Sequence, residues 1–108
     1  MRHTNLASGH WFAMSLAEQL GNVGSEVERA VRWRQKGDSE QFQKAFERML
    51  ELLDLTLSDK RWRGYRLQEL ARAREELCRI FTNKDFSQNI IGVQNYFLYF
   101  GILARANR

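Results

Sequence analysis

The segment Lys60–Arg66 has the clearest potential for chemistry in this sequence of 108 residues. Four of its residues are Lys or Arg, none is acidic, and two are aromatic. The chain holds 17 Lys and Arg against 13 Asp and Glu, so these four cations formally account for its net charge of +4. Cations neutralise phosphates, and aromatic rings stack on unpaired bases. The pattern predicts a nucleic-acid site made by Lys60, Arg61, Trp62, Arg63, Tyr65 and Arg66.

The same segment also has a purely structural interpretation, which the sequence leaves open. In that interpretation Trp62 packs back onto the fold and the surrounding charges are merely solvated. A second basic group lies upstream and consists of Arg29, Arg32, Arg34 and Lys36. We favour a structural role for this group, because cations in the last turns of a helix interact favourably with its dipole. In an up-down topology the two basic groups lie at opposite ends of one bundle.

Residue types that build metal or catalytic sites are sparse. The only histidines, His3 and His10, occur among the first ten residues, and Cys78 is the only cysteine. We therefore expect no metal site, no cofactor and no enzymatic activity. Cys78 lies on or near the apolar stripe of its helix, which predicts a buried structural thiol. A lone cysteine without a secretory signal favours a cytoplasmic location.

Capping signals and apolar periodicity predict the first two helices. The chain contains no proline, so long helices can run without interruption. Ser15–Glu18 has the S-x-x-E pattern of a capping box, and Gly37 is typical of a residue just past a helix end. Asp38 can cap the second helix, whose apolar spacing continues to Leu57.

The same signals predict two further helices after a break at residues 58–64. One covers about residues 65–81, and the last covers about residues 88–106. Asp85 or Ser87 can cap this last helix.

Length and connection lengths define the expected architecture. A chain of 108 residues fits one domain. The short connection between the first two helices requires them to be antiparallel. We predict an all-α, antiparallel four-helix bundle over residues 15–106, preceded by an N-terminal arm at residues 1–14. Because the arm contains Trp11 and Phe12, which are costly to expose, we expect the bundle or a partner to cover it.

Small residues form a stripe on the first predicted helix, at Ala17, Gly21 and Gly24. Each glycine costs roughly 1 kcal/mol of helix stability relative to alanine, so their spacing needs an explanation. We favour close packing against another helix of the same chain, with a contact between subunits as the alternative.

The last predicted helix is apolar nearly all round. A four-helix bundle buries only one face of each helix, so the surplus must be covered by the arm, a second copy or another partner. We expect a homo-oligomer. The predicted interface residues are Ile91, Tyr96, Leu98, Tyr99, Ile102 and Leu103. We expect no membrane span, because Gln94 and Asn95 interrupt the most apolar segment, Ile90–Ala104.

Three segments carry a resemblance to known proteins: Met14–Val27, Phe46–Thr56 and Arg72–Cys78. Together they resemble a group of short, uncharacterised prokaryotic helical proteins, across most of the chain. In architecture the chain is also similar to small basic four-helix bundles related to ribosomal intervening-sequence proteins. Some of those bundles are nucleic-acid-binding accessories of reverse transcriptases, so this likeness implies a role beside a nucleic-acid enzyme.

These observations favour a non-enzymatic, oligomeric bundle that binds RNA or single-stranded DNA as an accessory to a nucleic-acid enzyme. The alternative is a protein-interaction or scaffolding module whose relevant surface is apolar. Salt dependence separates the two, since phosphate binding weakens steeply with salt and apolar association does not.

Overall fold

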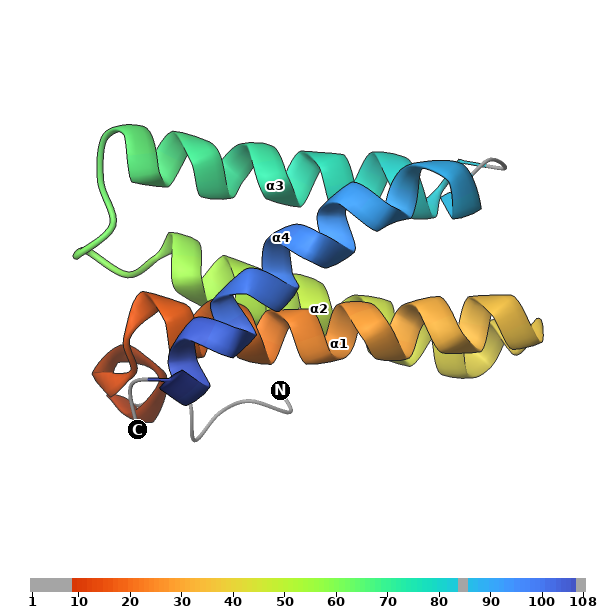
Figure 1. Cartoon of the computed structure of the whole chain (residues 1–108), viewed down its shortest axis with the longest axis horizontal. Helices are drawn as coiled ribbons and strands as arrows, with labels where there is room; N and C mark the ends of the chain where they lie inside the picture. The colour runs from red at the N-terminus through yellow and green to blue at the C-terminus, as the bar shows by residue number, and fades with distance from the viewer. Residues whose placement is uncertain (1–8, 84–85, 107–108) are drawn as a thin grey trace.

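The computed structural model describes residues 9–83 and 86–106, and this part of the chain contains four α-helices and no strand (Figure 1). A short 3-10 helix, Trp11–Ala13, precedes the first of them. The four α-helices are α1 (Leu16–Lys36), α2 (Ser39–Leu57), α3 (Tyr65–Phe81) and α4 (Phe86–Ala106). The prediction of an all-α four-helix bundle is confirmed.

The boundaries of α1 and the start of α2 follow from their capping residues. The Ser15 hydroxyl accepts the backbone N–H of Glu18 at 3.1 Å, while the Glu18 carboxylate accepts the N–H of Ser15 at 2.9 Å. Gly37 ends α1 with φ of 76°, a left-handed conformation that glycine adopts without strain. The Asp38 carboxylate accepts the N–H of Gln41 at 3.0 Å and so begins α2. The predicted capping box is confirmed.

The start of α4 differs from the prediction. The helix begins at Phe86, so Ser87 lies within its first turn rather than at the N-cap position. The other predicted cap, Asp85, lies outside the described residues.

Helix α1 is the centre of the arrangement. It packs closely against both α2 and α4 and is antiparallel to each of them (Figure 1). Helix α3 contacts α2 and α4 more sparsely. Side chains from all four helices and Trp11 fill the core, and Phe42, Phe46 and Phe81 form an aromatic group with ring centroids 5.5–5.8 Å apart.

Glycines bring α1 and α4 unusually close together. A Cβ added to Gly21 would lie 3.2 Å from the Cα of Gly101. One added to Gly24 would lie 3.0 Å from the Cβ of Phe97, closer than side chains normally approach. The small-residue stripe on α1 therefore serves packing within the chain, the interpretation that the sequence favoured.

The described end of the N-terminal arm is part of the fold. Trp11 is fully buried, and its indole N–H donates to the Thr56 hydroxyl on α2 at 3.2 Å. Residues 1–8 lie outside the described residues. The prediction for Cys78 was wrong, since its side chain is only half-buried on α3. No helix of the described residues is long and apolar enough to cross a membrane.

Candidate nucleic-acid interface

A buried polar network fixes the loop between α2 and α3. Gln19 on α1 is fully buried at its centre. Its amide NH2 group donates to the backbone carbonyl of Trp11 and to the carboxylate of Asp59, each at 3.0 Å. Its amide oxygen accepts the indole N–H of Trp62 at 2.9 Å. Donors and acceptor of this side chain all have partners, so the network links the arm, α1 and the loop without an unsatisfied amide.

Arg61 belongs to this network. Its guanidinium lies 2.7 Å from the buried Asp59 carboxylate and donates to the backbone carbonyl of Met14 at 2.6 Å. Hydrogen bonds from Arg61, and from Gln19, outweigh burial and lower the pKa of Asp59 to about 2. The side chain of Arg61, which the sequence analysis assigned to phosphate binding, thus ties the loop to the start of α1 while remaining 43% exposed.

Trp62 is also engaged within the fold. Its ring is half-buried against the core, and the Arg61 guanidinium lies 4.5 Å above it. One ring face is thus covered and the indole N–H is bonded, so the ring is not an open platform for a base. For Trp62 the structure favours the structural interpretation.

The remaining residues of the segment project outward. Lys60 and Arg63 are exposed and make no ion pair with any residue that the structure describes. Tyr65, at the start of α3, is 92% exposed. Arg66 pairs with Glu69 at 2.7 Å, but both side chains are nearly half exposed. Solvent screens such a pair, so it contributes at most about 1 kcal/mol and can exchange for a phosphate.

A shallow hollow of about 410 Å³ adjoins Lys60 and Arg63. Leu57, Trp62 and Leu67 give it apolar walls, and Lys60 and Arg63 lie among its lining residues. Two cations beside an apolar wall suit a phosphate rather than a stacked base, because the Trp62 ring is already engaged within the fold.

The second basic group is dispersed. Arg29 pairs with Glu26 on the same helix at 3.1 Å, and Arg34 donates to the backbone carbonyls of Phe81 and Asn83. The Lys36 ammonium lies 5.1 Å above the ring of Trp33, and Arg32 is exposed.

These contacts give Arg34 a structural role, through carbonyls at the end of α3. The group lies at the C-terminal end of α1, whereas Arg61 contacts Met14, two residues before α1 begins. The two basic groups are therefore at opposite ends of the bundle.

The exposed face of α4 contains four of the six predicted interface residues. These large apolar side chains are 52–61% exposed and are Ile91, Leu98, Tyr99 and Ile102. Tyr96 differs, since its hydroxyl donates to Glu69 at 2.9 Å and its ring packs on Phe97 and Phe100. Burial and this hydrogen bond raise the pKa of Tyr96. Leu103 is half-buried.

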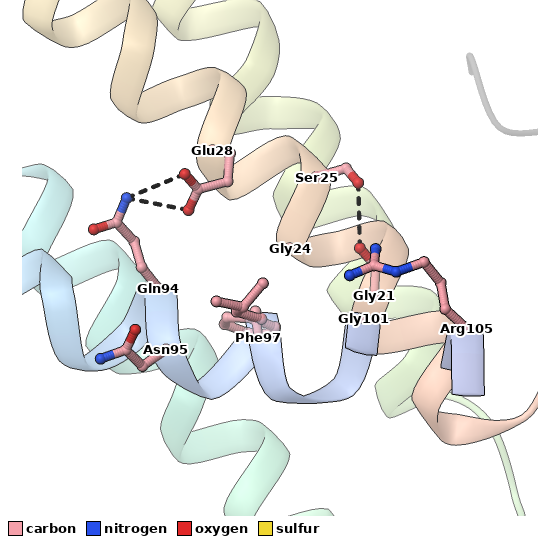
Figure 2. A pocket seen from close by; sticks show the side chains of 10 residues that line it. Gly21, Gly24, Ser25, Glu28, Gln94, Asn95, Phe97, Gly101 and Arg105 are labelled. Atoms are coloured by element: carbon pink, nitrogen blue, oxygen red, sulfur yellow. Dashed lines mark hydrogen bonds between the residues drawn. The ribbon is translucent and has the colours of Figure 1, made fainter. Parts of the chain in front are cut away.

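A groove of about 370 Å³ runs between this face and α1 (Figure 2). Its lining includes the close glycines Gly21, Gly24 and Gly101. At one end of the groove, the Gln94 amide NH2 group donates hydrogen bonds to the two carboxylate oxygens of Glu28 on α1, at 3.1 and 3.2 Å. Arg105 lies at the other end (Figure 2).

The sequence analysis missed Gln19 and Asp59. The signal for Asp59 was its place two residues before Arg61 in a helix break, where aspartate commonly accepts hydrogen bonds from the following backbone. The carboxylate accepts the backbone N–H of Arg61 at 3.0 Å. Nothing in the sequence pattern singles out Gln19, because a polar residue beside an apolar stripe is usually solvated.

Among the described residues, no three His, Cys, Asp or Glu side chains come together in a way that could hold a metal ion. Comparisons with protein-family models, curated proteins and solved structures give no match to this chain.

Proposed function

We propose that the protein is a non-enzymatic helical bundle that binds RNA or single-stranded DNA through the loop before α3, as an accessory to a nucleic-acid enzyme. The observation that carries this proposal is Tyr65, an aromatic side chain that is 92% exposed and follows Lys60 and Arg63, two exposed cations that make no ion pair with the described residues. At this exposure the ring contributes little to packing among the described residues. Single-strand binding proteins use such rings to stack on bases.

The buried network supports this function by holding the loop in place. Asp59 and Arg61 bond to each other and to neighbouring elements, so the backbone between α2 and α3 needs little ordering on binding. A preorganised loop loses less conformational entropy when a ligand binds. Lys60 and Arg63 then contact phosphates, and Tyr65 stacks on a base.

The test replaces Lys60 and Arg63 together with glutamine and measures anisotropy of a labelled oligonucleotide over a range of salt. Losing two phosphate contacts should reduce the slope of log affinity against log salt by roughly 1.4–1.8 per engaged loop, at about 0.7–0.9 per contact. A matched control replaces Lys44 and Arg72, two exposed cations on α2 and α3, and should leave the slope nearly unchanged. Equal effects of the two double variants would mean that only net charge matters, which contradicts a site at the loop.

Tyr65→Ala separates stacking from charge. If the ring stacks on a base, single-strand binding should weaken by about 1–3 kcal/mol while the salt slope and the melting temperature stay nearly unchanged. A wild-type protein without any salt-sensitive binding would refute the proposal.

A second candidate function is a protein-interaction or scaffolding module. The exposed apolar face of α4 favours it, because exposed apolar patches on soluble proteins commonly mark interaction sites. Partner binding through this face would persist at high salt, where phosphate binding is lost.

A further inference from the structure

The exposed residues of α4 form a seam of the kind that pairs two helices. Ile91, Asn95, Leu98 and Ile102 are all exposed and alternate steps of four and three along the helix. This is the spacing of a coiled-coil contact, which places its residues on one narrow stripe. The seam is mainly apolar, and the chain's own helices do not cover it.

The backbone of Gly101, beside this seam, lies close to Gly21 of α1, but that contact does not require residue 101 itself to be glycine. A Cβ added there would meet nothing within 4 Å. A glycine inside a helix costs roughly 1 kcal/mol relative to alanine. The open space at Gly101 lies in the groove, next to Leu98 and Arg105. Close approach of another helix would account for it.

Charge complementarity indicates which helix would fill the groove between α1 and α4, and in which direction that helix would run. Glu28 and Arg105 lie toward opposite ends of the same groove (Figure 2). Arg105 makes no hydrogen bond or ion pair with the described part of the chain. A second copy running antiparallel brings its own Arg105 to Glu28, and the symmetric contact forms at the other end. A parallel copy would instead place Arg105 beside Arg105.

We propose that the chain forms a two-fold homodimer in which α4 packs antiparallel against α4 of a second copy. Leu98 of one chain lies opposite Ile102 of the other, and Asn95 lies opposite Arg105, which also reaches Glu28. The contact covers the C-terminal half of α4. It does not depend on nucleic-acid binding, so the measurements below use the protein alone.

The first measurement is the mass in solution by light scattering, combined with sedimentation to obtain the dissociation constant. Wild-type protein at micromolar concentration should show twice the 12.8 kDa of one chain. Leu98→Glu with Ile102→Glu should give a folded monomer, because both side chains are already exposed. Leu67→Glu, at an exposed leucine of α3, is the matched control and should remain a dimer.

The second measurement is a charge exchange that tests the pairing itself. Glu28→Arg and Arg105→Glu should each weaken the dimer by about 10–100-fold, because each change turns two attractions into two repulsions. The double variant should recover wild-type affinity, and an equimolar mixture of the two single variants should form a heterodimer. In a parallel dimer Arg105 would lie beside Arg105 of the other chain. Reversing that charge would replace one pair of like charges with another and would not weaken the dimer.

A cysteine at position 91 provides an independent check on direction. In a Cys78→Ser background, Ile91→Cys should form no disulfide between chains. In the proposed antiparallel register, residue 91 of one chain and residue 91 of the other are 18 residues apart, or about 27 Å along the helix axis. A monomeric wild type, single charge reversals without effect, or efficient cross-linking at position 91 would each overturn the proposal.

Discussion

Replacing Asp59 with asparagine tests whether the buried network holds the loop in place. The pKa of Asp59 is about 2 in the fold, against an ordinary value of 3.8, because Arg61 bonds to its carboxylate. A lowered folded pKa contributes stability that is present above the unfolded pKa and is lost as the pH falls through the folded one. The relevant window therefore runs from about pH 5 down to about pH 2.

The structure sets the size of the effect. A shift of nearly two pKa units corresponds to about 2.5 kcal/mol at 1.36 kcal/mol per unit. The Arg61 side chain is 43% exposed, so solvent screening reduces this to about 1–2 kcal/mol. The asparagine amide also has too few acceptors for the donors of Arg61 and Gln19, which costs roughly a further 1–2 kcal/mol at any pH.

Urea denaturation of wild type and Asp59→Asn between pH 7 and pH 2 measures this difference. The gap in free energy of unfolding should be about 2–4 kcal/mol at pH 7 and should shrink by about 1–2 kcal/mol by pH 2. The control, Asp54→Asn, removes a carboxylate that pairs with Arg74 in solvent, and its gap should stay below about 1 kcal/mol. A gap for Asp59→Asn that does not change with pH would refute the assignment of this ion pair.

Two further predictions concern packing and are measured by urea denaturation. Gly24→Ala should destabilise the fold by about 1–2 kcal/mol because its Cβ collides with Phe97, whereas Gly92→Ala, with open space around its Cβ, should gain up to about 1 kcal/mol. Trp62→Ala should lower the free energy of unfolding by about 2–4 kcal/mol, and nucleic-acid binding should fall only as a consequence of lost structure. A stable Trp62→Ala protein with weakened binding would instead restore the stacking interpretation.

The helices could be predicted because their signals are local. Ser15, Gly37 and Asp38 act on backbone groups within a few residues, so capping patterns place helix ends without knowledge of the fold. The spacing of apolar residues likewise fixes which face of each helix is buried. The close approach at Gly21 and Gly24 was foreseen for the same reason, since glycine inside a helix is unfavourable without a packing role.

Which cations of the loop bond within the fold and which face solvent could not be predicted in the same way. Arg61 and Arg63 differ little in sequence context, yet one contacts Met14 from 47 positions away while the other faces solvent. Which cation is used depends on where α1 begins relative to the loop, and that is set by tertiary packing. Gln19 was missed for the same reason, because its partners come from the arm and from the loop.

The dimer that we propose would change how the loop could bind a strand. Gly21, near the start of α1, contacts Gly101 near the end of α4, and Arg61 contacts Met14 just before α1. The loop therefore lies at the same end of the bundle as the C-terminal half of α4.

Pairing through that half would bring the loop-bearing ends of two chains toward the centre of the dimer and leave the ends of α1 with Arg29–Lys36 outside. One strand that contacts both loops would then bind with the combined charge of two sites. Linked sites of this kind raise affinity well beyond that of either site alone. Two loops that each bind a strand weakly could therefore bind it tightly together in the dimer.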